Sequence, residues 1–292
     1  MKTNKCFLKG LAAAALVGVV TFTGVPAKAA HELIFAVDVN DNLVTFYSDA
    51  PGTIISAYSI TGLQLNEQIR GLDAWEGTLY GLGSGSHLYT IDPYTGAATQ
   101  AGSGQFSPLL NGQTFGVDNA GSNGLRVVSA LGQNLLINHG TGAATAGPNA
   151  NYVSGDIYFG AAPRVDALAY DQFAGKWYAA DTSKNSVASF NPTTGGLSTI
   201  GPIGFDVARF NGMDISPDTG IMYLISGATS SDTQGNLYII NKLTGMNTLV
   251  GLVGDVGDEV LYRALTVAPE PSSIALVALG VLGLFMARRR KQ

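Results

Sequence analysis

Apolar and polar residues alternate in short runs along most of the chain, and turn-forming residues separate the runs. A clear unit reads Leu79-Tyr80-Gly81-Leu82, a turn, Leu88-Tyr89-Thr90-Ile91-Asp92, and then Pro93-Tyr94-Thr95-Gly96. Alternation with a period of two predicts half-buried β-strands rather than amphipathic helices. Proline presets the turn, and glycine takes the left-handed position that closes it. The pattern therefore predicts an all-β fold with almost no helix.

This unit recurs along the chain. Its Thr-Gly turns end at Gly96, Gly142, Gly195 and Gly245, which are 46, 53 and 50 residues apart, and a degenerate first copy begins at Leu33. A period of roughly 40–50 residues with several strands per unit is typical of β-propeller blades. One further strand precedes most units, at Ile69–Asp73, Thr114–Asp118, Val165–Tyr170 and Phe210–Ile215. We predict a β-propeller of five blades with four strands each.

The first unit lacks this preceding strand, and an unassigned strand, Tyr262–Val267, follows the last unit. We expect this C-terminal strand to complete the first blade, because closing the ring removes the exposed sheet edges. The glycine-rich segment Gly147–Ala162 is then a connection between the third and fourth blades. The alternatives are six or seven blades, with that connection forming part of a blade, or an open β-sandwich.

Residues 1–29 have the pattern of a secretory signal peptide. A basic head at Lys2 and Lys5 precedes the apolar run Leu11–Val20, and Ala27-Lys28-Ala29 forms an A-x-A cleavage site. We expect cleavage after Ala29, with Ala30 as the alternative, so that residues 30–267 form the folded domain. The chain's one cysteine leaves with this segment, which excludes disulfides and cysteine chemistry in the mature protein.

Residues 268–292 form a second targeting segment. Pro269-Glu270-Pro271 precedes the apolar run Ile274–Ala287 and the basic cluster Arg288-Arg289-Arg290-Lys291. Fourteen residues of helix reach only about 21 Å, against about 30 Å of hydrocarbon, so this transmembrane helix is expected to anchor the chain only transiently. The basic cluster should remain cytoplasmic, which places the folded domain outside.

Together the Pro-Glu-Pro motif, the apolar run and the basic cluster resemble the PEP-CTERM sorting signal. The resemblance implies processing by an exosortase, a membrane transpeptidase of bacteria that have outer membranes and typically make exopolysaccharide. It also implies delivery of the folded domain to the cell envelope or the extracellular matrix.

Charge excludes one class of partner. Only 13% of the residues are charged, and residues 31–267 contain 8 basic side chains, scattered along the sequence, against 20 acidic ones, a net charge of −12. A body this acidic repels phosphate backbones, so nucleic acid is excluded as a partner.

The repeated region also resembles a bacterial family. Gly71-Leu72-Asp73, Gly77–Leu82, Leu88–Asp92, Arg126–Ser129 and Gln133–Leu135 are similar to the pattern of the secreted family catalogued as domain of unknown function 4394. The chain departs from that pattern at Ala74-Trp75, where we expect Arg-Pro, and at Leu136, where we expect a basic residue. The resemblance supports the fold and export, and any ligand that needs those basic residues would be lost here.

The sequence offers little evidence of catalysis. No G-x-S-x-G nucleophile motif is present, and the glycine-rich runs near Gly83 and Gly104 lack the strand–loop–helix context of a phosphate site. Alignment of the repeats places His87 and His139 at turn positions. Asp38-Val39-Asn40-Asp41-Asn42 resembles the start of a calcium loop, but it lacks the glycine and the closing glutamate, so we interpret it as a hairpin.

Aspartates are the stronger candidates. Asp73, Asp118 and Asp214 end the channel-lining strands of their units, and Asp171 lies near the matching place. Such carboxylates could converge on a ligand or on Ca²⁺ at one channel mouth. The simpler interpretation, which we adopt at this point, is that each carboxylate caps a turn within its own blade, with no metal and no calcium response.

Two classes of function remain open. The first is a non-catalytic module of the envelope or matrix that binds extracellular polysaccharide or envelope proteins. The second is an extracellular enzyme, such as a glycan lyase or hydrolase, acting at the channel mouth. Fold alone cannot choose between them, but the missing nucleophile–base motif and the turn positions of the histidines favour the first.

Overall fold

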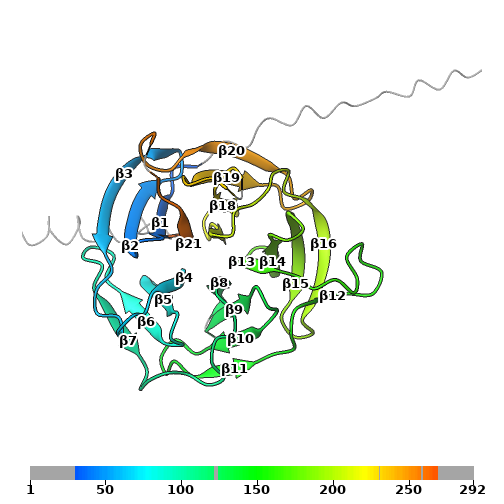
Figure 1. Ribbon diagram of the computed structural model, residues 1–292, viewed down its shortest axis with the longest axis horizontal. Coiled ribbons are helices and arrows are strands. Elements are labelled where there is room, and N and C mark those ends of the chain that lie inside the picture. The colour runs from blue at the N-terminus through cyan, green and yellow to red at the C-terminus, as the bar shows by residue number, and fades with distance from the viewer. Residues whose placement is uncertain (1–29, 122–123, 230, 258, 269–292) are drawn as a thin grey trace, which may run out of the picture.

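The computed structural model describes residues 30–121, 124–229, 231–257 and 259–268. These residues form 21 β-strands and no α-helix, and the strands make five sheets, antiparallel except for one short edge strand, that are arranged as a ring (Figure 1). The fold is a five-bladed β-propeller, which confirms the prediction and rules out both the higher blade counts and the sandwich. No helix of the described residues is long and apolar enough to cross a membrane. Both targeting segments, with Ala29 and Pro269-Glu270-Pro271, lie outside the described residues.

The strands of each blade are named below in order from the channel to the outer edge of the ring. Blade 1 contains β21 (Tyr262–Val267), β1 (Leu33–Asp38), β2 (Asn42–Tyr47) and β3 (Ala50–Ser59). Blade 2 contains β4 (Ile69–Trp75), β5 (Thr78–Gly83), β6 (Leu88–Ile91) and β7 (Ala98–Ala101). Blade 3 contains β8 (Phe115–Asn119), β9 (Leu125–Ser129), β10 (Asn134–Ile137) and β11 (Ala144–Ala146). Blade 4 contains β13 (Val165–Asp171), β14 (Lys176–Asp181), β15 (Ser186–Asn191) and β16 (Gly196–Pro202). Blade 5 contains β17 (Asn211–Ile215), β18 (Met222–Ser226), β19 (Asn236–Ile240) and β20 (Asn247–Leu252).

The C-terminal strand closes the ring as predicted. β21 pairs antiparallel with β1, with Ile34 opposite Val267 and Ala36 opposite Leu265. The innermost strand of blade 1 therefore comes from the end of the chain, whereas its other three strands come from the beginning. This pairing leaves the ring without an open sheet edge between its first and last blades.

The segment predicted to be a plain connection between blades 3 and 4 contains a strand. β12 (Asn151–Tyr152) pairs parallel with β16 and adds a fifth strand to the outer edge of blade 4. Tyr152 is buried there, and its hydroxyl donates a 2.7 Å hydrogen bond to Asp181. The sequence pattern missed this strand because it is only two residues long, too short for its alternation to be recognised.

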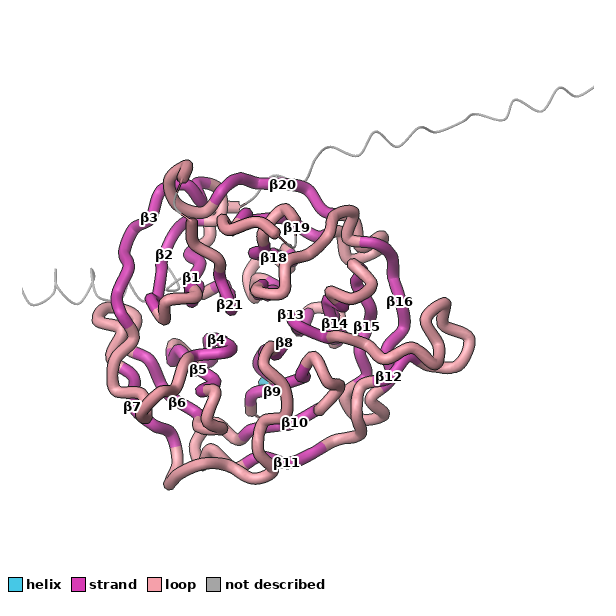
Figure 2. Tube along the Cα trace, in the orientation of Figure 1, coloured by secondary structure: helices cyan, strands magenta, loops and turns pink. Residues whose placement is uncertain are grey.

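The predicted Thr-Gly turns close the outer hairpins. Gly96, Gly142, Gly195 and Gly245 all have φ between 67° and 78°, the left-handed region that strongly favours glycine. The loops they form lie at the periphery of the tube view (Figure 2). Repetition of this turn is the reason that the sequence shows its period so plainly.

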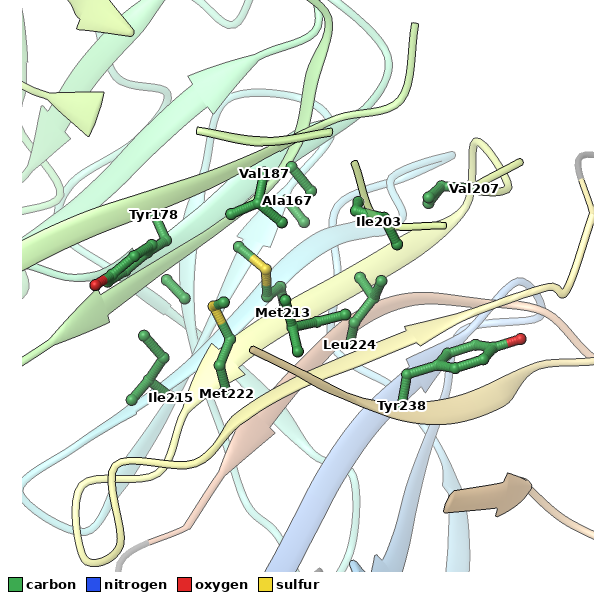
Figure 3. Close-up of a cluster of buried hydrophobic side chains, with 13 residues drawn as sticks. Ala167, Tyr178, Val187, Ile203, Val207, Met213, Ile215, Met222, Leu224 and Tyr238 are labelled. Carbon is green, nitrogen blue, oxygen red and sulfur yellow. The ribbon is translucent and has the colours of Figure 1, made fainter. Parts of the chain in front are cut away.

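The hydrophobic core lies between adjacent blades. In the largest cluster, Tyr178 and Val187 of blade 4 face Met213, Met222 and Leu224 of blade 5 (Figure 3). Similar clusters fill the other junctions. Because each blade buries its two faces against its neighbours, the ring is stabilised as a whole, and the inner strands are held at fixed distances around the channel.

Candidate functional site

Three inner strands bring the predicted aspartates together. Asp73 lies on β4, Asp118 on β8 and Asp214 on β17, and each is at least 95% buried. One carboxylate oxygen of each lies within 4.8 Å of the corresponding oxygens of the other two. Residues separated by as much as 141 positions in the sequence thus meet at one end of the channel.

A glycine two residues before each aspartate makes this approach possible. The inner strands read Gly71-Leu72-Asp73, Gly116-Val117-Asp118 and Gly212-Met213-Asp214. A Cβ atom on any of the three glycines would lie between 2.2 and 2.5 Å from an atom of the next blade, which is too close for a real contact. The repeated Gly-x-Asp pattern is the sequence signal for the convergence, and the prediction of the aspartates as turn caps did not take it into account.

The carboxylates bond across blade junctions, which corrects the expectation of caps within each blade. Asp118 accepts a hydrogen bond from the backbone N–H of Tyr170, on blade 4, and Asp214 accepts one of 2.7 Å from Val267, on blade 1. Each also accepts a bond from the next residue of its own strand, at 2.5 Å for Asn119 and 2.6 Å for Ile215. The expectation is therefore correct for one backbone bond of each of these two carboxylates, and it missed their bonds to the adjoining blades.

Thr266 joins two of the carboxylates. Its hydroxyl oxygen lies 2.9 Å from Asp73 Oδ1 and 3.1 Å from Asp214 Oδ2. A hydroxyl group carries one proton and donates one strong hydrogen bond at a time. Whichever of Asp73 and Asp214 does not receive this hydrogen bond faces a lone pair of the hydroxyl oxygen. That contact is unfavourable for an ionised carboxylate and favourable for a protonated one, which can donate to the hydroxyl.

The site holds concentrated negative charge away from water. Burial raises the pKa of Asp73 well above its usual range, and repulsion from Asp214 adds to this shift. Burial, followed by repulsion from Asp73, raises the pKa of Asp118 in the same way. Burial also raises the pKa of Asp214, to about 6, although hydrogen bonds from Val267 and Ile215 oppose the change. None of the ion pairs among the described residues involves these three carboxylates.

A pocket of about 290 Å³ opens above the carboxylates. Trp75, Tyr170 and Pro217 contribute apolar surface to its wall, while the three aspartates and Asn119 contribute polar atoms. Two buried groups in it have unused hydrogen-bonding capacity among the described residues: Asp73 Oδ2, and both polar atoms of the Asn119 side chain. A pocket that combines aromatic surface with a few buried polar atoms has the form of a ligand site.

Asp171, the fourth aspartate considered, belongs to a different structure. It follows the channel-lining part of β13, accepts 3.0 Å bonds from the backbone N–H groups of Phe173 and Ala174, and pairs with Lys242. The position that matches Asp73 in blade 4 is Ala169, since Ala169 pairs with Tyr178 as Asp73 pairs with Tyr80. Asp171 caps its turn, as expected for an aspartate at a strand end.

The histidines lie in loops, as predicted, and both have partners beyond their turns. His87 Nδ1 lies 3.1 Å from a carboxylate oxygen of the buried Glu67 side chain. His139 stacks on Tyr80 with ring centroids 4.5 Å apart, and burial lowers its pKa. Neither residue lines the pocket above the aspartates. The Asp38–Asn42 segment is a hairpin, as predicted, with Asp38 accepting 2.8 Å bonds from the N–H groups of Asn40 and Asn42.

Arginines gather at the other end of the channel. Arg70, Arg209 and Arg263 line a small cavity at the beginnings of the inner strands, and Arg164 lies beside it, paired with Asp166 at 2.9 Å. Arg70 precedes Asp73 by three residues, so the two ends are roughly 10 Å apart along the strand. The basic side chains that look scattered in the sequence thus give the channel one positive and one negative end.

The protein is a five-bladed β-propeller with an acidic pocket at one mouth of its channel. The family model described as Domain of unknown function (DUF4394) matches residues 42–262, most of the chain, and the chain belongs to this family. The PEP-CTERM protein-sorting motif matches residues 267–291. This motif identifies the protein as one exported to the cell envelope or extracellular space of a Gram-negative bacterium and processed by an exosortase. No protein with a curated description matches the sequence.

Several solved structures are similar to this chain at low sequence identity. A chain of a nidogen/laminin complex is 10% identical with a TM-score of 0.49, over 82% of this chain and 98% of that one. Glutaminyl cyclase of Myxococcus xanthus is 12% identical with a TM-score of 0.46, over 77% and 97%. A Bacteroides thetaiotaomicron protein of unknown function is 16% identical with a TM-score of 0.47, over 77% and 59%. At these values the likenesses carry no argument about function.

Proposed function

We propose that the protein is a non-catalytic binding module of the envelope or extracellular matrix, and that its acidic channel mouth holds a segment of extracellular polysaccharide. The observation that carries the proposal is the pocket itself, in which aromatic surface and unused polar atoms face the same space. Sugar rings present both apolar C–H faces and hydroxyl groups, so they complement a wall of Trp75 and Tyr170 above carboxylate and amide acceptors. The sorting signal supports the same role, because it delivers the domain to the place where such polymers lie.

The spacing of the carboxylates favours binding over hydrolysis. Retaining glycosidases hold their two carboxyl groups about 5–5.5 Å apart, and inverting ones about 6.5–9.5 Å, so that sugar and water fit between them. Here one oxygen of each carboxylate lies within 4.8 Å of the other two, and Asp118 and Asp214 accept backbone hydrogen bonds from the neighbouring strands β13 and β21 rather than standing on opposite sides of an open cleft. The geometry therefore suits a shared ligand or ion better than an acid/base pair.

Trp75 is one of the residues at which this chain departs from the pattern that we expect for the family, and it lies in the pocket wall. Its ring lies within 4.0 Å of the Gly121 position, next to the opening. Where the resemblance leads us to expect Arg-Pro, Ala74 and Trp75 give this pocket an apolar and aromatic wall without a positive charge. We infer that this member of the family prefers a neutral, ring-shaped ligand segment at this point. Leu136 lies on β10 and does not line the pocket.

The test is affinity electrophoresis of the exported protein in gels that contain the producing organism's extracellular polysaccharide, with a parallel assay for released reducing ends. We expect retarded migration without released product. Trp75→Ala should abolish the retardation, whereas Tyr94→Ala, which removes an aromatic side chain that is 81% exposed on a distant turn, should leave it unchanged. Release of product would favour the alternative, a glycan lyase or hydrolase. Equal migration with and without polysaccharide would contradict the proposal and favour a protein partner.

A further inference from the structure

The three buried carboxylates have the spacing of ligands to one cation. Two oxygens bound to the same Ca²⁺ at 2.3–2.6 Å can be at most about 5 Å apart. The oxygens of Asp73, Asp118 and Asp214 lie within 4.8 Å of one another and therefore meet this limit together. They come from three rigid inner strands, which leaves little freedom for the cluster to spread apart.

Unsatisfied groups around the cluster point independently to a missing ligand. Asp73 Oδ2 is buried and has no hydrogen-bond partner among the described residues while its neighbouring carboxylates are ionised. Asn119, which is 93% buried and lines the same pocket, has neither its amide N–H₂ nor its carbonyl oxygen hydrogen-bonded within the described chain. Leaving such groups buried without a hydrogen bond is unfavourable. A bound ion would satisfy Asp73 Oδ2, and Asn119 faces the same pocket from which the waters of such an ion would come.

The negative charge of the cluster also favours a bound cation. Three carboxylates stand together in a buried site, and the arginines of the channel lie at its other end. Burial of uncompensated charge is strongly unfavourable, so the cluster must take up protons or a cation. The single proton of Thr266, shared between Asp73 and Asp214, cannot neutralise either of them.

We propose that Asp73, Asp118 and Asp214 bind one divalent cation, and that Ca²⁺ is the ion they suit best. All the ligands are hard oxygen atoms, with no imidazole or thiolate among them, which disfavours Zn²⁺ and Cu²⁺. Mg²⁺ requires a compact octahedral shell at 2.0–2.1 Å, whereas Ca²⁺ accepts longer and less regular bonds together with waters from the open pocket. This proposal reverses the expectation drawn from the sequence, that no calcium response would be found.

The cation site forms the floor of the pocket used in the proposed function, but it does not require a glycan. If both exist, the ion would fix the pocket floor and offer its open coordination positions to sugar hydroxyls. Calcium alone is therefore the probe, and failure of the glycan assay would leave the cation result intact.

The experiment measures thermal unfolding of the exported protein at pH 7.5 after treatment with chelator and re-addition of CaCl₂ or MgCl₂. At about one hundred times the Kd, Ca²⁺ should raise Tm by roughly 5–10 °C. Mg²⁺ should have a smaller effect, and chelator should reverse the shift. Asp73→Asn should abolish the response, because it removes one charge while keeping an acceptor for Thr266.

Asp171→Asn is the matched control. Asp171 is also a buried aspartate at the end of an inner strand, but it is paired with Lys242 outside the cluster. This variant can lose stability and should still keep the full calcium shift. If Asp73→Asn fails to fold, Tb³⁺ luminescence of the unmodified protein, excited through Trp75 and Tyr170 in the pocket wall, reports binding directly, and Ca²⁺ should quench it by competition. A Tm insensitive to both calcium and chelator, together with no sensitised Tb³⁺ emission, would overturn the proposal, as would a calcium shift that survives in Asp73→Asn.

Discussion

Gly116 and Ala167 stand so close that a Cβ atom on Gly116 would lie 2.5 Å from the carbonyl carbon of Ala167. The two residues belong to the inner strands of blades 3 and 4, and their contact sets how near those blades come at the channel. Asp118 follows two residues later and reaches the backbone N–H of Tyr170 on blade 4. The close approach of two backbones is therefore part of the acidic site.

Substitution of this glycine should loosen both the ring and the site. Because backbone opposes the new methyl group in Gly116→Ala, strain cannot be relieved by rotation of a side chain, and we expect a loss of about 1–3 kcal/mol in the free energy of unfolding. Gly104→Ala is the control, since nothing lies within 4 Å of its Cβ position and its φ is not left-handed. Urea denaturation measures both, and the control should change by less than about 0.5 kcal/mol. A Gly116→Ala protein as stable as its control would show that the inner strands are not tightly constrained.

Removal of the last strand should open the ring. A chain ending at Gly257 lacks β21, so blade 1 loses its inner strand, and Asp214 loses the N–H of Val267. The expected loss of several kcal/mol is a large part of the roughly 5–15 kcal/mol that a domain possesses. The shorter chain should aggregate, while one ending at Pro269 stays soluble. Equal melting temperatures for the two chains would contradict the role of β21 as the closing strand.

Stability of the metal-free protein should fall as pH rises from 5 to 8. The raised pKa values of Asp73, Asp118 and Asp214 mean that the folded state holds protons more tightly than the unfolded state. This stabilisation is complete below the pKa of an aspartate in the unfolded state, near 4. It is lost as pH rises through the pKa values of the folded state, and the folded-state pKa of Asp214 is about 6. Asp214 alone should contribute about 1 kcal/mol over this range.

Urea midpoints with chelator at pH 5 and pH 8 measure this effect. The lowered pKa of His139 acts in the opposite direction below about pH 6.5, so the slope is best compared with that of Asp214→Asn, in which His139 is unchanged. The variant should show a weaker loss of stability towards pH 8. A midpoint that rises with pH in the unmodified protein and in the variant alike would mean that the three carboxylates are ionised at little cost.

Two of the arginines at the basic end, Arg70 and Arg263, should respond differently to loss of charge. Burial, followed by repulsion from Arg263, lowers the pKa of Arg70, so Arg70→Gln should be neutral within about 0.5 kcal/mol or stabilising. Arg263→Gln breaks a 2.9 Å ion pair with Asp41 and a hydrogen bond to the carbonyl of Val39, at a side chain only 8% exposed. It should lower stability by about 1–3 kcal/mol. Thermal unfolding of the two variants in parallel measures this difference. An Arg70→Gln protein less stable than the Arg263→Gln protein would contradict the prediction.

Processing of the tail can be read from the mass of the mature protein. Pro269-Glu270-Pro271 precedes the apolar run of the sorting motif, so the envelope form should end before Ile274. Intact mass spectrometry of the envelope fraction measures this, and cells without exosortase provide the control, in which the basic end stays attached. Detection of Arg288–Lys291 on the mature protein in cells with an active exosortase would refute processing.

The sequence by itself determined the architecture, because the features that specify a propeller are local. Alternation over four to six residues marks each strand, glycine with positive φ marks each turn, and a period near 50 residues marks each blade. Even the closure of the ring followed from counting, since one blade lacked an inner strand and the chain ended with a spare one. The two-residue strand β12 escaped because it has no periodicity of its own.

Tertiary structure alone decided the site. The position of each aspartate at the end of an inner strand could be predicted, but its partners lie on other blades, and their distances depend on how closely the strands pack around the channel. Gly71, Gly116 and Gly212 allow that packing because they lack a side chain, and the alternation of apolar and polar residues alone does not reveal this. The gathering of Arg70, Arg209 and Arg263 at the opposite end arises in the same way. Charges far apart in the sequence become neighbours only when the ring closes, because a closed ring brings every inner strand to a single axis.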